Sequence, residues 1–218
     1  MTVNIIARHL LNCADTELFN GGVTMKIRVL GLSEKYKFPQ TQVHLLLNDQ
    51  LVIFLRSWNG IDANQKVIDE INHFLSAADA DLEVTTPFEF VENLSSMANK
   101  VRISVLLAND IIFKTENKEK YMQGYELAII FKNKNEIAWS TVGRFEISSN
   151  KNNKNITISH AGQFLDDQIL LPVALLGLER EPSVLSGSFS IKNLDQIQIQ
   201  SDFDQQSTYW KAHITNFE

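Results

Sequence analysis

Residues 51–60 read Leu-Val-Ile-Phe-Leu-Arg-Ser-Trp-Asn-Gly, and the rest of the fold can be worked out from this stretch. The apolar run Leu51–Leu55 has the length of a strand and lies between turn residues. Asn48–Asp49–Gln50 precedes it and favours a tight hairpin turn, so Val43–Leu47 is predicted as the antiparallel partner strand. The stretch therefore predicts a hairpin whose second strand leads towards a helix.

Two helices are predicted after this hairpin. Asp62 with Gln65 has the spacing of a capping box, and an apolar stripe follows it at helical spacing. Thr86 is predicted as the N-cap of the second helix, with Pro87 at the first helical position and Glu89 completing the box. Its apolar stripe continues to about Lys114. The two helices thus occupy most of the middle of the chain.

Most of the remaining sequence is predicted as strands joined in hairpins. They are Val23–Leu30 before the helices and, after them, Tyr125–Phe131, Glu136–Val142, Phe145–Ser148, Asn155–Ser159, Ser188–Ile191, Gln196–Gln200 and Thr208–Thr215. This order does not fit alternating βαβ units and favours an antiparallel α+β architecture. No linker divides the chain, so residues 1–218 are predicted as one domain, with residues 1–22 as an N-terminal extension of helical type.

Composition excludes several classes of function. The 218 residues carry a net charge of −6, which argues against a dedicated nucleic-acid binder. No apolar run approaches the roughly 18–20 residues of a membrane span, and Cys13 is the only cysteine, which excludes a disulfide framework and a thiolate metal cage. We therefore expect a cytoplasmic protein that binds neither nucleic acid nor membranes.

Several local strings resemble the metal-dependent serine/threonine protein phosphatases (the PPM family, type 2C-like), and their order and spacing carry the resemblance from about Val23 to Ile214. Where the family has a strand ending in Ala-Asp-Gly-Met-Gly-Gly before its first helix, this chain has residues 55–60. The other corresponding strings are residues 37–42, 105–112, 139–146, 171–177, 194–203 and 205–208. The resemblance implies a four-layer α/β/β/α sandwich of two antiparallel sheets flanked by helices.

In this family two divalent metal ions, held by aspartates, activate the water that hydrolyses a phosphomonoester. The resemblance places the metal-site positions at Gln42, Arg56, Ser57, Asp202 and Gln205, and of these only Asp202 retains a carboxylate. A guanidinium at position 56 stays protonated and would put a fixed positive charge where a metal should bind. Hard cations need anionic oxygen ligands, so we expect no bound metal, no cofactor and no two-metal catalysis.

The resemblance therefore implies a catalytically inactive PPM-like pseudophosphatase that acts as a binding or regulatory domain. One alternative is an active phosphatase with a rearranged site that uses Asp202 with Asp195, Asp204 or Glu146. Another is a purely structural interaction domain, because fold does not fix function. The expected partner is a protein, and the sequence does not choose among a kinase, a phosphoprotein and a second copy of the chain.

Two arrangements are open for the altered site. Arg56 and Asp202 end two central strands in the resemblance, so we expect an ion pair between them in place of the metals. Alternatively, Lys37, Arg56 and Arg144 converge as an anion-binding pocket, which would suit a phosphorylated partner.

Overall fold

The computed structural model describes residues 16–18, 25–31, 39–58, 63–79, 86–120, 123–151, 154–159, 174–204 and 207–217. Its two helices are α1 (Asn64–Asp79) and α2 (Ser96–Thr115), and η1 (Ile191–Asn193) is a single 3₁₀ turn. The strands are β1 (Thr16–Leu18), β2 (Lys26–Gly31), β3 (Thr41–Leu46), β4 (Leu51–Ser57), β5 (Tyr125–Lys132), β6 (Glu136–Val142), β7 (Phe145–Lys151), β8 (Lys154–Ser159), β9 (Leu185–Ser190), β10 (Gln196–Asp204) and β11 (Ser207–Thr215).

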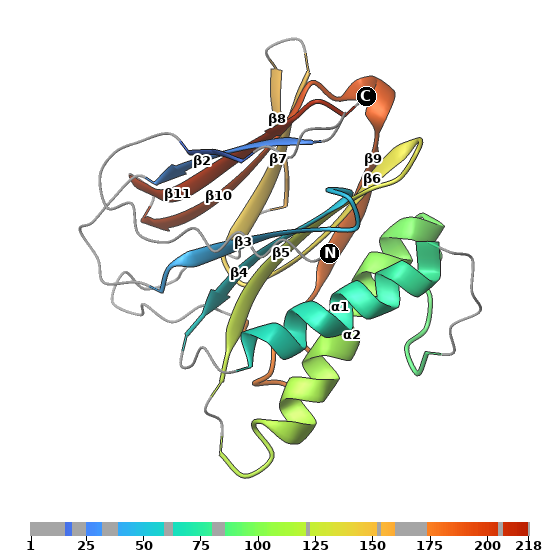
Figure 1. The fold of residues 1–218 in the computed structure, drawn as a ribbon, viewed down its shortest axis with the longest axis vertical. Helices are drawn as coiled ribbons and strands as arrows, with labels where there is room; N and C mark the ends of the chain where they lie inside the picture. The colour runs from blue at the N-terminus through green and yellow to red at the C-terminus, as the bar shows by residue number, and fades with distance from the viewer. Residues whose placement is uncertain are drawn as a thin grey trace.

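The strands form two sheets in which all neighbours are antiparallel (Figure 1). Sheet A has the order β1-β2-β11-β10-β7-β8, and sheet B has the order β3-β4-β5-β6-β9. Because β6 belongs to sheet B and β7 to sheet A, the short turn Gly143–Arg144 carries the chain from one sheet to the other. This corner lies at one end of the sandwich and becomes part of the candidate site.

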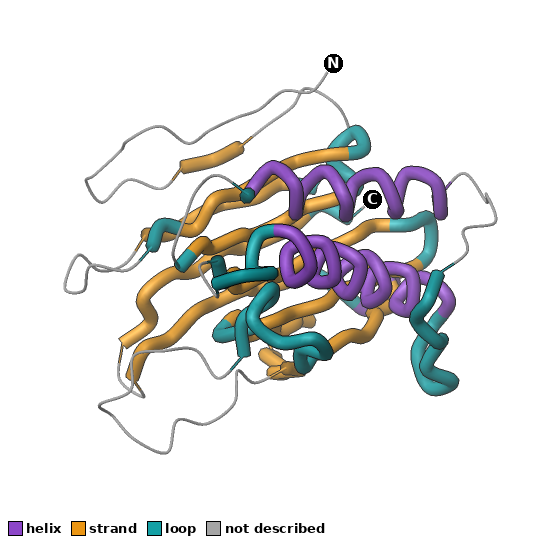
Figure 2. Tube along the Cα trace, turned by 90° about the horizontal axis from the view of Figure 1, so that it is seen from below, coloured by secondary structure: helices purple, strands orange, loops and turns teal. Residues whose placement is uncertain are grey.

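Two apolar cores hold the layers together. One lies between the two sheets, and the other lies between sheet B and the helices, which cover the outer face of sheet B (Figure 2). In β4, Leu51, Ile53 and Leu55 belong to the helix-side core, whereas Val52 and Phe54 belong to the core between the sheets. Central strands that are buried on both faces are apolar throughout, which explains the unbroken run in this strand.

The predicted α+β class and the two packed antiparallel sheets are confirmed. Three layers of the predicted four occur among the described residues, in the order sheet A, sheet B and helices. Within those residues no α-helix packs on the outer face of sheet A. The helical prediction for residues 1–22 is wrong for Thr16–Leu18, which form β1 and pair with β2, and the remainder of that extension lies outside the described residues.

The predicted start of the second helix is also wrong, because the N-cap of α2 lies nine residues after Thr86, at Ser95. Ser95 is its N-cap, and its hydroxyl accepts a hydrogen bond from the backbone N–H of Ala98 at 3.1 Å. Thr86 instead closes a short loop turn by accepting from the N–H of Phe88. The capping spacing at Thr86 is therefore present without a helix after it. For α1, the predicted cap Asp62 lies outside the described residues.

The other predicted strands occur, several with shifted bounds: the prediction Ser188–Ile191 corresponds to β9 (Leu185–Ser190), and Gln196–Gln200 corresponds to the longer β10 (Gln196–Asp204). The strand Glu136–Val142 has the predicted bounds, and the turn at 47–50 places Leu47, Asn48 and Asp49 at positive φ, as a tight hairpin requires. Within the described part of the chain, neither helix combines the length and the apolar character that a bilayer span needs.

Candidate functional site

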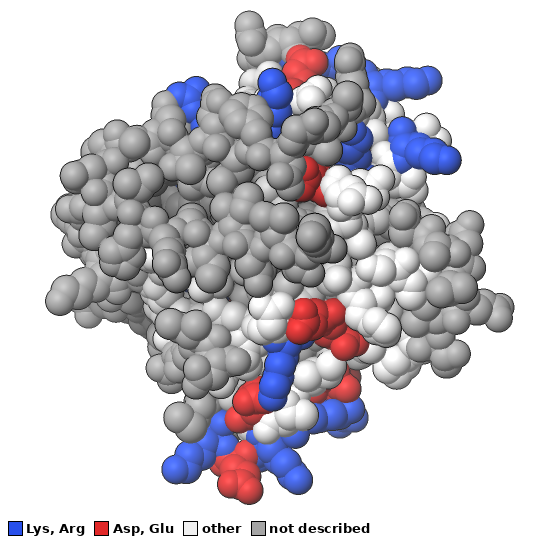
Figure 3. All heavy atoms as spheres, viewed as in Figure 1, with Lys and Arg blue, Asp and Glu red and all other residues white. Residues whose placement is uncertain are grey.

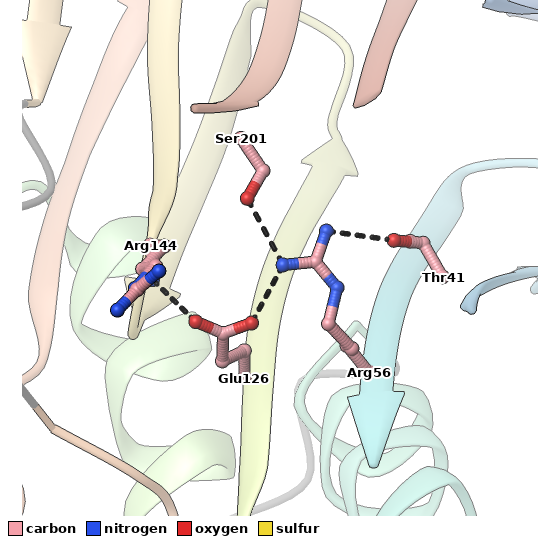
Figure 4. A network of polar contacts seen from close by, with 5 residues as sticks. All are labelled: Thr41, Arg56, Glu126, Arg144 and Ser201. Carbon is pink, nitrogen blue, oxygen red and sulfur yellow. Dashed lines mark hydrogen bonds and ion pairs between the residues drawn. The ribbon is translucent and has the colours of Figure 1, made fainter. Parts of the chain in front are cut away.

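Arg56 lies at one end of the core between the sheets, and its side chain is completely buried. Its Nη1 donates to Glu126 Oε2 at 2.7 Å and to Ser201 Oγ at 2.9 Å, and its Nη2 donates to Thr41 Oγ1 at 3.0 Å (Figure 4). Glu126 is also completely buried. Arg56, which the resemblance assigns to a metal-site position, is thus the centre of a buried polar network.

Strand register explains why these side chains meet. Arg56 lies opposite Glu126 of β5 and opposite Thr41 of β3, so the three side chains share one face of sheet B. Ser201 of β10 lies opposite Phe145 of β7 in sheet A. The Arg56 guanidinium carbon lies 5.0 Å from the centre of the Phe145 ring, a cation–π distance. The network therefore joins the two sheets across the core.

The second oxygen of Glu126 is held by the corner between β6 and β7. The backbone N–H of Arg144 donates to Glu126 Oε1 at 3.1 Å. Gly143 beside it has φ +89, and a Cβ there would lie 2.5 Å from Glu126 Cγ, so only glycine leaves room for the carboxylate. Both oxygens of Glu126 are thus engaged, one by a side chain and one by the backbone.

Arg144 also buries its side chain at this corner. Burial lowers the pKa of its guanidinium, the nearby Glu126 carboxylate raises that pKa and Arg56 lowers it. These influences show that the two arginines and the glutamate share one electrostatic environment. Glu126 lies between the two guanidinium groups and screens one from the other.

Of the residues predicted for the site, the structure brings Arg56 and Arg144 together through Glu126. Gln42 lies elsewhere: its side-chain oxygen accepts from Nδ2 of Asn64 at the start of α1, on the helix side of β3. Ser57 is opposite Tyr125 and follows Arg56 by one residue, so it points to the other face of β4 from Arg56.

Three predicted positions are described only in part or not at all. Asp202 follows Ser201 in β10, and its backbone lies opposite Thr208, but its side chain lies outside the described residues. Gln205 and Lys37 lie outside them entirely. The Arg56–Asp202 pair and the three-residue anion pocket therefore stay predictions.

The sequence interpretation missed Glu126, Thr41 and Ser201. Glu126 did carry a signal, because it is the only charged residue in the otherwise apolar strand segment 125–131, as Arg56 is in residues 51–57. A buried charge needs a partner of opposite sign. Two lone charges on two buried strands could therefore have been paired from the sequence alone.

The described residues do not fit a two-metal centre. A divalent pair needs several anionic oxygens around an open space, whereas this end of the sandwich holds a guanidinium bound to Glu126. Among the described residues, no three His, Cys, Asp or Glu side chains gather in a group that could hold a metal ion. The arrangement instead provides a fixed polar link between two sheets.

Comparison with known proteins agrees with this architecture. No protein-family model and no curated protein sequence matches the chain. Among solved structures, a serine/threonine phosphatase from Staphylococcus aureus is 10% identical with a TM-score of 0.56, covering 89% of this chain and 94% of that one. The catalytic domain of the phosphatase PstP, solved with two manganese ions, is 13% identical with a TM-score of 0.52, covering 88% and 99%.

A third similar structure is PppA of Pseudomonas aeruginosa, described as a key regulatory component of T6SS. It is 10% identical with a TM-score of 0.54, and the match covers 88% of this chain and 96% of that one. At such identities the likeness concerns the fold alone. This chain has the fold of the PPM serine/threonine phosphatases.

Proposed function

We propose that this chain is a catalytically inactive pseudophosphatase that acts as a binding or regulatory domain on the PPM fold. The observation that carries the proposal is the buried Arg56–Glu126 pair at the end of the core between the sheets. Its partner is a protein, either a kinase, a phosphoprotein or a second copy of the chain. We place the protein in the cytoplasm as part of the same proposal.

Electrostatics support the loss of catalysis. A guanidinium keeps its proton at any physiological pH, so Arg56 is a permanent cation. Two unit charges of like sign 4 Å apart repel by about 4 kcal/mol at an effective dielectric constant of 20, and a divalent ion doubles this. The Glu126 carboxylate offsets the charge of Arg56 but spends its Oε2 on that contact. A metal ion near these groups would therefore be opposed rather than attracted.

The rival active site receives little support from the described residues. Asp195 precedes β10, and its backbone N–H donates to the carbonyl of Asn150. Asp195 lies seven positions before Asp202 in the sequence. At about 3.3 Å per strand residue, that is on the order of 20 Å from Asp202. Glu146 accepts from Gln200 on the outer face of sheet A, whereas its neighbours Phe145 and Ile147 face the inner core. Neither of these two carboxylates lies near Arg56, and the side chain of the third candidate, Asp204, lies outside the described residues.

A combined activity and stability experiment tests the proposal. Purified protein is incubated with p-nitrophenyl phosphate and millimolar Mn²⁺, beside an active PPM phosphatase as the positive control. We expect no turnover that chelator abolishes. We also expect an unchanged melting temperature in Mn²⁺, whereas a metal at 100 times its Kd would stabilise the fold by about 2.7 kcal/mol. Turnover that requires Mn²⁺ and disappears in Asp202→Asn would overturn the proposal.

A further inference from the structure

The loop before α2, residues 86–95, exposes two apolar side chains to solvent. Phe90 is 56% exposed and Val91 is 39% exposed. Phe88 and Leu94, on either side of them, pack instead against the core between sheet B and the helices. Figure 2 shows the loop as the teal segment that projects at the right-hand end of the helices. The loop is therefore anchored by its flanks and displays Phe90 near its centre.

Buried hydrogen bonds hold this loop on α2. Asn99, which is 2% exposed, accepts from the backbone N–H of Val91 at 2.7 Å and donates to the carbonyl oxygens of Val91 and Leu94 at 3.0 and 3.3 Å. Nη1 of Arg102 donates to the carbonyl oxygen of Glu89 at 3.2 Å. Because the loop backbone is already ordered, docking through it costs less conformational entropy than docking through a loose segment.

Charged groups of both signs lie beside the exposed apolar pair. Glu92 occupies a corner of the turn that the N–H of Leu94 closes on the carbonyl of Val91, and its side chain is exposed. Glu92 forms no ion pair with another described residue, and neither does Arg102, whose printed contact is to backbone oxygen. We call Phe90, Val91, Glu92 and Arg102 the loop patch. The patch thus combines an apolar centre with one carboxylate and one guanidinium that have no partner of opposite charge among the described residues.

The loop patch lies at the end of the helix pair that is remote from Arg56. Lys100 in the first turns of α2 donates to the carbonyl of Ala78 at the end of α1, so the loop adjoins that end of α1. The other end of α1 is near the buried network, since Asn64 donates to Gln42 of β3. At 1.5 Å per residue, the 16 residues of α1 span about 24 Å. A partner at the loop therefore leaves the buried network untouched.

The helical side of the molecule mixes both signs of charge. On the face drawn in Figure 3, lysine and arginine lie among aspartate and glutamate over the lower half, where Figure 1 draws the helices. Two copies of a chain of net charge −6 repel each other at long range. They can associate only where apolar contact and local pairs of opposite charge outweigh that repulsion. The loop patch offers both.

We infer that a second copy of this chain docks on the loop patch to form a two-fold dimer. In such a dimer both copies present the same surface, so the surface must be complementary to itself. Phe90 and Val91 pack against the same loop of the other copy, and Glu92 of each copy pairs with Arg102 of the other. Aromatic side chains on ordered segments commonly dominate the binding energy of an interface. The inference rests on the binding role proposed above and selects the second copy among its candidate partners.

The size of the patch predicts a weak dimer. A stable interface buries about 800 Å² on each partner. Two exposed apolar side chains and one charge pair on each side supply much less than this area. We therefore expect a reversible equilibrium, with monomer prevailing at low micromolar concentration and dimer becoming populated towards millimolar concentration.

Sedimentation velocity of the full chain over this concentration range tests the inference. Phe90→Ser removes the apolar centre of the patch and should weaken self-association at least about tenfold, because the change is present in both copies. Leu185→Ser is the matched control, since Leu185 is a large apolar residue of β9 that is 43% exposed. We expect the control to change the association constant less than about twofold.

A charge exchange shows whether the polar contacts run between copies. Glu92→Arg and Arg102→Glu should each suppress the dimer, because like charges then meet at both contacts. An equal mixture of the two variants should associate again. The new arginine of one variant then meets the new glutamate of the other, and the second contact keeps its original pair. Within each chain the two charges are alike, so a contact inside one chain cannot explain such a recovery.

Circular dichroism checks the fold of each variant, since Arg102→Glu also removes the hydrogen bond to the Glu89 carbonyl. If that variant unfolds, Phe90→Ser and Glu92→Arg still decide the inference against the Leu185→Ser control. A chain that stays monomeric up to millimolar concentration overturns it, as do equal losses in Phe90→Ser and Leu185→Ser. A mixture of two folded charge variants that fails to associate also overturns it. Self-association is measured without a phosphatase substrate, so its failure is distinct from failure of the catalytic proposal.

Discussion

Arg56 and Glu126 lie directly opposite each other on β4 and β5, and their charged groups meet at 2.7 Å between the two sheets. Both side chains are removed from water, so each carries a large desolvation cost that the opposite charge of the other helps to offset. The pair also reaches sheet A through Ser201. It is therefore a connection between layers as well as within one sheet.

Loss of one partner should destabilise the fold strongly. Arg56→Met leaves the Glu126 carboxylate buried without its guanidinium, and we expect a loss of about 3–5 kcal/mol in the free energy of unfolding, measured by urea titration. Glu126→Gln should cost a similar amount. The double variant should lose less than the sum, because neither member of the pair then leaves the charge of the other uncompensated. Strict additivity would refute coupling between the two residues.

An exposed ion pair provides the matched control. Lys114 and Asp110 form an i,i+4 pair on α2 with side chains that are 68% and 31% exposed. Lys114→Met should therefore cost no more than about 0.5 kcal/mol. A loss comparable to that of Arg56→Met would show that burial is not the cause.

Asp202 can be tested in the same way, since its side chain is outside the described residues. We expect Asp202→Asn to couple with Arg56→Met if the carboxylate also contacts the guanidinium. A coupling free energy within about 0.3–0.5 kcal/mol of zero would mean that Glu126 alone balances Arg56.

Gly143→Ala should disturb the same network through the backbone. Its φ of +89 is unfavourable for alanine, and the new Cβ would lie 2.5 Å from Glu126 Cγ. We expect a loss of about 2–5 kcal/mol from the combined strain and overpacking. Gly124→Ala is the comparison, because its Cβ would meet the movable end of Leu175. Equal urea midpoints for the two variants would contradict this account.

The fold could be predicted well from the sequence because its signals are local. The segment Leu51–Leu55 of β4 is apolar on both faces, and Asn48 and Asp49 in the turn after β3 are residue types that tolerate positive φ. The prediction of where α2 starts was wrong because a capping pattern such as that at Thr86 looks the same whether or not a helix follows it. Asn99 binds the backbone of Val91 and holds the intervening residues as a loop, a tertiary contact that sequence spacing cannot reveal.

The site was harder to predict because register decides it. Matching strings by spacing assigned Gln42 to the site, but Thr41 is the residue opposite Arg56. A shift of one residue along a strand moves a side chain to the other face of the sheet. Ser201 joins Arg56 across 145 positions of sequence, a contact that depends on how two sheets pack. Local pattern contains no information of that kind.

The corrected start of α2 leads to a direct test. Ser95→Ala removes the hydroxyl that accepts from the N–H of Ala98, and we expect a loss of about 1 kcal/mol in the free energy of unfolding. Thr86→Ala should cost less, because that hydroxyl caps no helix. Urea titration of both variants decides between the two starts, and a larger loss for Thr86→Ala would favour the earlier one.

Stability should fall in mild acid because of a half-buried histidine. Burial lowers the pKa of His44 in the folded protein, whereas in the unfolded chain it stays near its ordinary value of about 6.5. As pH falls through that value, the unfolded chain binds a proton that the folded protein resists, so the unfolded state gains stability. We therefore expect the free energy of unfolding to fall less in His44→Gln than in the unmodified chain as the pH drops from about 7.5 to about 5.5. His73→Gln, which removes an exposed histidine on α1, is the matched control. If both variants show the same pH dependence, desolvation of His44 does not contribute.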